Sequence, residues 1–423
     1  MDILTFGSAS TGQRARLPSK NSRNFDQRHD GKTAFWASTA TLARVGSCRR
    51  HRAMWTSSAS IYQCILFCSV LFQTHSYTNH WQVRFVIHST FSIASSVGYT
   101  MTTTQITTSP TDMFFKLNTG TTIPAIGLGT WLSDPDQVKS AVKEALKIGY
   151  RHIDTAAIYG NEDAVGEAIQ QSGIPRSDIF LTSKLWCNSH RPEDVLPALN
   201  KSLEKLKTDY LDMYHMHWPV ALKPGPELFP IDENGHGVGD PLGTDYVVTW
   251  KAMEKIFRET NKVRNIGVSN FTVHQLDRLL RNSEIVPAAI QIELHPYSLQ
   301  GEIREFAKDH GIHVTAYSPF GNLNPTYADK LKEKGVRRKV IDDPVVTLIA
   351  EKYHATPNQI LVSFQVALGN SVIPKSVHAE RIKENFTVIR LDIEDVFSLS
   401  KLNKNVQFNT VADTFGPDFA RIE

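Results

Sequence analysis

The chain has few cysteines and no long apolar segment. Only four of its 423 residues are cysteine, and three of these lie in the first hundred, so Cys187 is alone in the rest. A single cysteine cannot crosslink a domain, which indicates a reducing compartment, and we expect a cytoplasmic protein. The apolar run IYQCILFCSVLF at 61–72 is shorter than the roughly 20 residues that a membrane-spanning helix needs. We therefore expect no membrane association.

Net charge is also small, and it is unevenly distributed. The formal net charge of +3 is too little to predict a nucleic-acid or membrane-surface partner. Residues 1–100, however, hold eleven Lys/Arg against three Asp/Glu, so the rest of the chain is net acidic. The first segment is rich in Ser and Thr and has no helical or strand periodicity, which is typical of low order. We therefore divide the chain into a basic, low-order extension at 1–112 and a folded domain at 113–423.

Two interpretations of the extension stay open. Its Arg- and Ser-rich, acid-poor composition is compatible with an organelle transit peptide. Alternatively, translation begins at Met101 or Met113, where a short polar lead passes directly into patterned sequence. We favour the later start, which makes the extension dispensable.

The sequence also lacks a glycine-rich Rossmann motif. No G-x-G-x-x-G follows the first strand-like run of the folded domain. The domain instead alternates short apolar, β-branched runs with amphipathic stretches, which is typical of βα units around a parallel sheet. Eight such runs in about 300 residues favour a (β/α)8 TIM barrel over a doubly wound sheet. The expected strands are 125–129, 151–154, 179–184, 211–217, 263–269, 288–293, 313–318 and 371–374. The clearest expected helices are 136–149, 192–206, 272–283 and 358–368.

Additional segments decorate the expected barrel. MFFKLNTGTTIPAIG at 113–127 predicts a β-hairpin that turns at 118–120 and plugs one barrel end. Long connections at 219–246 and 319–343 lack periodicity, and both follow strand carboxyl ends, where barrel enzymes have their active sites. We therefore expect both connections to be functional.

Polar side chains stand at the carboxyl ends of six expected strands. Burying a charge or an amide without a partner costs several kcal/mol, so this many polar groups in a barrel interior indicate a site. Their variety, with both charges, an amide and a phenol, favours a reaction site at one barrel mouth. No set of carboxylate and histidine ligands stands on these strand ends, so we expect no metal and no metal-dependent hydrolase. The six residues are Asp154, Lys184, His217, Gln291, Tyr317 and Lys375.

Eight segments resemble the aldo-keto reductases, and they follow the order of that family between about residues 114 and 405. They are GTW (129–131), GYRHIDTAAIYGNE (149–162), LTSKLW (181–186), YLDMYHMHWP (210–219), IGVSNF (266–271), QIELHPY (291–297), AYSPFGN (316–322) and VIPKSVHAERIKEN (372–385). The resemblance implies a (β/α)8 oxidoreductase that acts on CH–OH groups and carbonyls and uses NADPH without a Rossmann domain.

The resemblance also implies four catalytic residues. Tyr159 would be the proton donor, Lys184 and Asp154 the pair that tunes it, and His217 the residue that orients the carbonyl. Such groups are needed because hydride addition leaves an alkoxide-like oxygen that must be protonated and stabilised. Since an ammonium group favours phenolate, we expect Lys184 to lower the pKa of Tyr159 from its ordinary value of about 10. Taken alone, Lys184 and Asp154 could equally form a structural ion pair.

Two groups of residues are implied to bind NADPH, one at each end of the cofactor. At one end an aromatic ring would stack on the nicotinamide, while hydroxyl and amide groups would bind its carboxamide. At the other end turns and basic groups would bind the pyrophosphate and the 2′-phosphate, and a carboxylate and an amide would bind adenine. The nicotinamide group comprises Tyr317, Ser269, Asn270 and Gln291. The adenosine group comprises Ser318, Phe320, Lys375, Ser376, Val377, Arg381, Glu384 and Asn385. These residues favour NADPH and leave dual use of NADH open.

Three tryptophans at strand ends, Trp131, Trp186 and Trp218, are implied to wall an aromatic substrate pocket of broad specificity. The tail at 405–423 departs from the usual family tail and is expected to form a third specificity loop. We expect reduction of small aldehydes and ketones such as glyceraldehyde, dihydroxyacetone, aldoses or uronates, by a monomer or weak dimer. Two alternatives stay open: the reverse oxidation of polyols such as glycerol with NADP, and a nucleotide-binding regulatory subunit without turnover.

The two histidines of YHMHWP pose a separate question. On a strand, His215 and His217 point to the same face, so a metal pair is geometrically allowed, but a third ligand is missing. The resemblance places His217 in the site. His215 stands where the family usually has an aliphatic residue, and we expect a core histidine that has a hydrogen-bond partner.

Overall fold

The computed structural model describes residues 107–108, 110–321 and 332–422. The expected low-order extension therefore lies outside the described residues, except for its last few positions. Of these, Thr107–Thr108 form strand β1, which pairs antiparallel with β12 (Val388–Ile389), and Pro110–Asp112 form a 3-10 turn.

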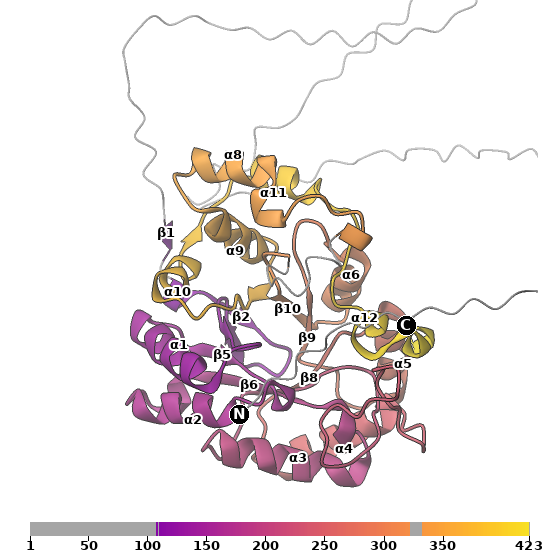
Figure 1. Ribbon diagram of the computed structural model, residues 1–423. Helices are drawn as coiled ribbons and strands as arrows, with labels where there is room; N and C mark the ends of the chain where they lie inside the picture. Colours follow the sequence, from indigo (N-terminus) through magenta and orange to yellow (C-terminus); the bar gives the residue numbers. More distant parts are fainter. Residues whose placement is uncertain (1–106, 109, 322–331, 423) are drawn as a thin grey trace, which may run out of the picture. The chain divides into compact units, whose positions relative to one another are not determined.

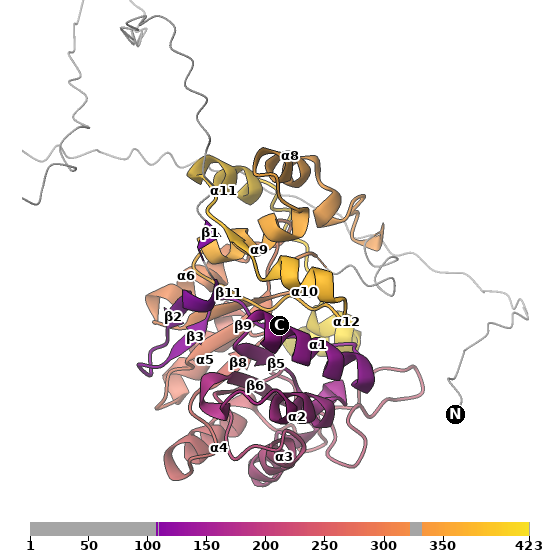
Figure 2. The same cartoon turned by 90° about the vertical axis from the view of Figure 1, so that its left-hand side faces the viewer.

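Eight parallel strands form one sheet in which every strand lies next to its neighbours in sequence (Figures 1 and 2). The first and last strands are joined by parallel bridges between Ile126 and Val372 and between Gly129 and Lys375, so the sheet closes on itself. This confirms the predicted (β/α)8 barrel and all eight predicted strands. The strands are β4 (Leu128–Gly129), β5 (His152–Asp154), β6 (Phe180–Leu185), β7 (Met213–Met216), β8 (Ile266–Ser269), β9 (Ala289–Glu293), β10 (His313–Tyr317) and β11 (Ser371–Val372).

Helices surround the barrel, as Figures 1 and 2 show. Helix α1 shows the expected amphipathic pattern, since its buried residues Val138, Ala141, Val142 and Ala145 follow the helical repeat. Thr272 and Thr356 begin α5 and α9 with capping boxes, which satisfy backbone N–H groups at the helix start. The helices are α1 (Pro135–Ile148), α2 (Glu162–Gln171), α3 (Pro192–Lys205), α4 (Tyr246–Glu259), α5 (Val273–Asn282), α6 (Gly301–Asp309), α8 (Pro344–Lys352), α9 (Pro357–Ala367), α10 (Ala379–Asn385), α11 (Ile393–Ser400) and α12 (Val411–Phe415). In the part of the chain that the structure describes, none of them has the length and apolar character needed to cross a bilayer.

A β-hairpin precedes the barrel, as predicted. Strands β2 (Phe114–Lys116) and β3 (Thr122–Pro124) pair antiparallel, and the turn between them is closed by the bond from the Leu117 N–H to the Thr121 carbonyl. Leu117 and Ile123 pack into an apolar cluster with the residues that begin strands β6, β7 and β9. The hairpin therefore plugs the amino-terminal end of the barrel, which leaves the carboxyl-terminal mouth for the site.

Three histidines lie on barrel strands. His152 on β5 and His215 on β7 are buried, and His313, the first residue of β10, is partly buried. Burial lowers the pKa of His152 to about 3 and that of His313 to about 4. Burial also lowers the pKa of His215 well below its ordinary value, and the positive charge of Lys184 adds to the effect. The Nε2 atom of His313 bonds the Ser371 hydroxyl at 2.9 Å, and that of His152 bonds Thr182 at 3.3 Å. The barrel interior thus holds neutral imidazoles.

Because of these histidines, we expect the free energy of unfolding to decrease at pH values well above the pKa values of the carboxylates. Each one has a folded-state pKa below the unfolded value of about 6.5, so the unfolded chain binds more protons as pH falls below about 6.5. The free energy of unfolding should therefore fall with pH, by about 1.4 kcal/mol per pH unit for each such histidine.

Urea denaturation of His215→Leu between pH 7 and pH 5 checks this prediction. The free energy of unfolding should change less steeply with pH than in the unchanged chain, by the amount that corresponds to roughly one proton fewer taken up on unfolding. Thr315→Val, a substitution in the same interior that removes no titratable group, should leave the slope as it was. An identical slope in the His215→Leu variant would contradict the prediction.

Candidate active site

A buried ion pair lies at the carboxyl-terminal mouth of the barrel. Lys184 on β6 donates to the Asp154 Oδ1 atom at 2.5 Å, and the two side chains are 0% and 2% exposed. Lys184 also donates to the Thr155 carbonyl at 2.9 Å. The second Asp154 oxygen accepts a bond of 2.7 Å from Gln291 on β9. Both charges are therefore hydrogen-bonded, the condition under which such a pair persists inside a protein.

Tyr159 and His217 lie against this pair. The Lys184 ammonium is 5.2 Å from the centroid of the Tyr159 ring, and the His217 ring meets the Tyr159 ring edge-on with centroids 5.7 Å apart. Tyr159 ends a 3-10 turn (Ala157–Tyr159) that follows β5, and Gly160 stops this turn with a left-handed φ of 68°. The structure thus brings together Asp154, Tyr159, Lys184 and His217, the four residues that the sequence suggested.

Burial dominates the protonation of the site. It raises the pKa of Asp154 and lowers that of Lys184, while the attraction between the two charges opposes both shifts. Burial, with a contribution from the Asp154 charge, raises the pKa of Tyr159 well above its ordinary value. The pKa of Tyr159 is therefore shifted upward and not downward as expected, and the charge that contributes to the shift is that of Asp154. Tyr159 consequently carries its proton at neutral pH.

His217 is a neutral imidazole. Burial lowers its pKa well below the ordinary value, and the charge of Lys184 adds to this shift. Its buried Nδ1 atom has no hydrogen-bond partner among the residues that the structure describes, and its ring lies edge-on to Trp186 with centroids 5.2 Å apart. The Asn270 side chain donates to the His217 carbonyl at 3.0 Å and so holds the end of β7.

His215 is a buried core histidine with a hydrogen bond to the backbone of Val268 on β8, as predicted. Within the described part of the chain, its Nδ1 atom makes no bond of ordinary geometry. The ring packs closely against Gly267, where a Cβ atom would stand 2.5 Å from Nδ1. Nor do the described ranges contain a cluster of three His, Cys, Asp or Glu side chains that could hold a metal ion.

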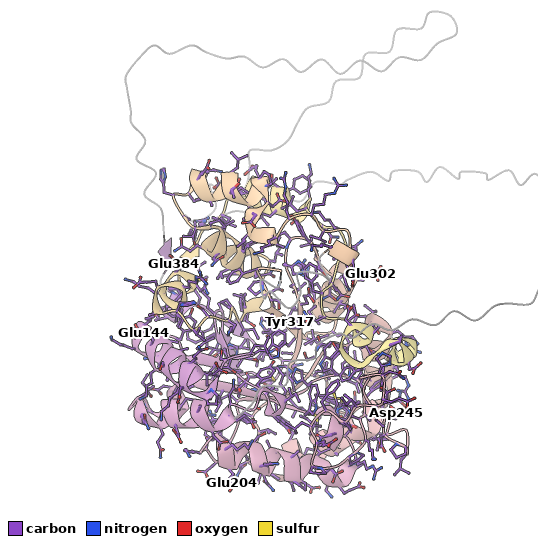
Figure 3. All side chains as sticks on the ribbon, in the orientation of Figure 1. Glu144, Glu204, Asp245, Glu302, Tyr317 and Glu384 are labelled. Atoms are coloured by element: carbon purple, nitrogen blue, oxygen red, sulfur yellow. The ribbon has the colours of Figure 1, made fainter. Side chains whose placement is uncertain are left out.

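The expected nicotinamide-binding residues also converge at the barrel mouth. Tyr317, at the end of β10, donates to the Asn270 Oδ1 atom at 2.8 Å, and Asn270 has a left-handed φ of 61° that turns it toward the mouth. The Ser269 hydroxyl donates to the Gln291 carbonyl at 2.8 Å. Figure 3 shows Tyr317 near the middle of the domain. These contacts tie three neighbouring strands, β8, β9 and β10, into one rim.

The expected adenosine-binding residues form a second group, on the connections after β10 and β11 and on α10. Ser318 has a φ of 48°, and Phe320 is buried. After β11, Lys375 donates to the Leu132 carbonyl at 3.1 Å, and Ser376 is buried beside a partly exposed Val377. On α10, Arg381 is exposed, and Figure 3 shows Glu384 toward the edge of the domain. Asn385 is 2% exposed, and within the described ranges its Oδ1 atom has no hydrogen-bond partner.

An aromatic cluster lies beside His217, which Trp186 contacts. Trp186 and Trp218 pack with Phe415 of α12, whose ring is stacked on Phe229 at 5.7 Å with an interplanar angle of 12°. The Trp186 indole N–H donates to the Leu228 carbonyl, which fixes the long connection at 219–246 against the mouth. Trp131 follows β4 and is partly buried. Phe415 and Phe229 were missed from the sequence, although both lie in segments expected to be functional.

Comparison with known proteins identifies the family. Residues 125–404 match the model of the aldo/keto reductase family. A protein of Schizosaccharomyces pombe named as an uncharacterized oxidoreductase is 48% identical over 314 residues, which are 74% of this chain and 95% of that protein. A D/L-glyceraldehyde reductase of Hypocrea jecorina is 43% identical over 311 residues, covering 71% of this chain and 91% of that protein.

A solved structure shares the fold. The Bombyx mori aldo-keto reductase in complex with NADP is 35% identical, with a TM-score of 0.64 over 72% of this chain and 98% of that one. The chain therefore belongs to the aldo/keto reductase family of NADP(H)-dependent oxidoreductases, which act on small carbonyl compounds.

Proposed function

We propose that this protein reduces small aldehydes and ketones of the glyceraldehyde, dihydroxyacetone, aldose or uronate type to alcohols with NADPH. The observation that carries the proposal is the buried Lys184–Asp154 pair, which lies against a protonated Tyr159 and a neutral His217 beneath an aromatic cluster. The similarity to a D/L-glyceraldehyde reductase supports the same substrate class. Oxidation of polyols such as glycerol is the reverse reaction at the same site.

The residues present fit the cofactor. Asn385 has a buried Oδ1 atom without a hydrogen-bond partner, which suits an amino group of adenine. Arg381 is exposed on the same helix and suits the 2′-phosphate, as do Lys375 and Ser376 at the end of β11. Tyr317, held by Asn270, offers a ring face to the nicotinamide. When bound, NADPH supplies the hydride that reduces the carbonyl carbon.

The four clustered residues divide the remaining work. Tyr159 gives its phenolic proton to the carbonyl oxygen as negative charge develops there. Lys184 then stabilises the phenolate that this transfer creates, and Asp154 keeps the ammonium charged and aimed. His217, being neutral, can donate a hydrogen bond to the same oxygen and so orients the carbonyl. Trp186, together with the rest of the aromatic cluster, excludes water from the reacting atoms.

Removing the phenolic hydroxyl tests the proposed function directly. Tyr159→Phe lacks the proton donor, so we expect kcat for glyceraldehyde to fall by a factor of about 10² to 10⁴ while NADPH binds with unchanged affinity. NADPH oxidation monitored with a panel of small carbonyls, together with NADPH titration by fluorescence, makes the measurement. Tyr246→Phe, which lies on α4, is the matched control and should retain full turnover. Substantial turnover in the Tyr159→Phe variant would eliminate the assigned role.

Breaking the ion pair of Lys184 with Asp154 should reduce both the stability and the activity of the protein. Lys184→Met leaves the Asp154 carboxylate buried without its cation, so we expect the free energy of unfolding to drop by about 3–5 kcal/mol and turnover to disappear. The double variant Lys184→Met/Asp154→Asn removes both charges and should regain most of that stability but no activity. Urea denaturation and NADPH oxidation report the two quantities. If the single variant is as stable as the unchanged chain, the two charges do not depend on each other.

We predict that Arg381 contributes to a preference for NADPH over NADH. A charge-assisted contact with the 2′-phosphate is worth about 1.5–3 kcal/mol, so Arg381→Ala should raise the KM for NADPH roughly tenfold or more and leave that for NADH unchanged. Lys383→Ala removes an exposed positive charge from the same helix and serves as the control. Steady-state kinetics with both cofactors distinguish the two variants. If Arg381→Ala and Lys383→Ala raise the KM for NADPH equally, the effect comes from the loss of positive charge in general, and the specific role of Arg381 is contradicted.

A further inference from the structure

A second buried carboxylate lies at the barrel mouth, and it holds the carboxyl-terminal segment. Glu293 is the last residue of β9 and is 1% exposed. Its two oxygens accept bonds from the Phe408 N–H at 2.9 and 3.1 Å. Its Oε2 atom also accepts bonds of 2.9 Å from both the backbone N–H and the side-chain amide of Asn409. A strand of the barrel thereby fixes two consecutive residues that are more than a hundred positions away in sequence.

His295 completes this contact. Its Nε2 atom lies 2.8 Å from the Glu293 Oε1 atom, its ring is fully buried, and it stacks on the Phe408 ring with centroids 5.4 Å apart. Burial works to raise the pKa of Glu293, but the hydrogen bonds from His295, Phe408 and Asn409 outweigh it, so the pKa lies below its ordinary value. Glu293 is therefore an anion that several donors hold in place.

The segment held in this way leads directly to the aromatic cluster. Thr410 caps α12, which ends at Phe415, and the Phe415 ring packs on Trp186, Trp218 and Phe229. Among the described residues, α12 is also held by the ion pair of Lys334 with Asp413 at 2.6 Å and by the bond from the Gly237 N–H to the Phe415 carbonyl at 2.8 Å. Lys334 and Gly237 belong to long connections, whereas Glu293 belongs to a barrel strand. Glu293 therefore ties the segment that leads to Phe415 to the barrel.

We propose that Glu293, supported by His295, is the positioning residue that fixes the carboxyl-terminal wall of the substrate pocket and thereby determines substrate specificity. The inference rests on the proposed function, since the pocket is that of the proposed reductase. Glu293 acts only through the wall: it holds Phe408 and Asn409, and Phe415 contacts the substrate. Substrates with an aromatic ring, which can stack on Phe415, depend on this contact most.

The test uses Glu293→Gln in the full chain. A glutamine amide has one acceptor oxygen, so its NH₂ group must face at least one N–H donor that the carboxylate now accepts. We expect the KM for 4-nitrobenzaldehyde to rise about tenfold or more, with kcat at saturation and the Kd for NADPH unchanged within about twofold. Phe415→Ala should show the same pattern, and the double variant should be no worse than Phe415→Ala alone.

Glu254→Gln is the matched control. Glu254 is also buried, and its carboxylate accepts two backbone N–H groups, from Glu284 and Ile285, but it lies on α4 away from the pocket. It should lower thermal stability as Glu293→Gln does without changing the KM for 4-nitrobenzaldehyde. An unchanged KM in Glu293→Gln overturns the proposal. The proposal is also overturned if the effects of Glu293→Gln and Phe415→Ala on KM add up in the double variant. A loss of kcat or of NADPH affinity in Glu293→Gln would overturn it too, because it would place the effect at Gln291 and Asp154.

Hydrogen exchange separates this inference from the proposed function. If the unchanged protein oxidises NADPH with none of the carbonyls, the proposed function fails, yet the anchor can still be measured. Exchange of the amides in residues 408–415 should become at least about tenfold faster in Glu293→Gln and stay unchanged in Glu254→Gln. Unchanged exchange in this segment would show that Lys334 and Gly237 hold α12 without Glu293, and would overturn the inference.

Discussion

The ion pair of Lys184 with Asp154 is the interaction on which the rest of the site depends. Two charges withdrawn almost completely from water are stable only if every remaining donor and acceptor is satisfied. Here the partners come from three strands. Lys184 on β6 also donates to the Thr155 carbonyl after β5, and Asp154 on β5 also accepts a bond from Gln291 on β9. These bonds therefore require the register of the strands at this level of the barrel. The closed sheet, joined at Ile126 and Val372, keeps that register.

Burial of the pair also determines the proton content of its neighbours. The interior that makes the Lys184–Asp154 attraction strong makes an unpaired charge costly, so Tyr159 stays protonated and His217 stays neutral. A protonated phenol is what a proton donor needs at rest. Lys184 is then required mainly after the proton has left, when a phenolate stands beside an ammonium that is already in place. The site is thus organised for the charge that develops during reaction, not for a charge present beforehand.

Sequence patterns predicted the parts of this protein that depend on local periodicity. Apolar, β-branched runs located all eight strands, and polar residues at their ends located Asp154, Lys184, His217 and Gln291. They could not predict contacts between distant segments: Phe229 and Phe415 meet only because two irregular segments fold over the same mouth. The direction of the Tyr159 pKa shift depended on burial, which no motif reveals. The close packing of the His215 ring against Gly267 of the adjacent strand was likewise not evident from the sequence.

Strand β9 connects the chemical centre to the substrate wall through simple alternation. Gln291 and Glu293 point to the same side because successive side chains of a strand alternate. Gln291 bonds Asp154, while Glu293, one step nearer the mouth, bonds the backbone N–H groups of Phe408 and Asn409. Since most of the Glu293 contacts are to backbone, they constrain the path of the tail more than its side chains. The tail at 405–423 can therefore differ in sequence and still be held by Glu293. Its side chains can then change the shape of the substrate pocket while the ion pair of Lys184 with Asp154 stays intact.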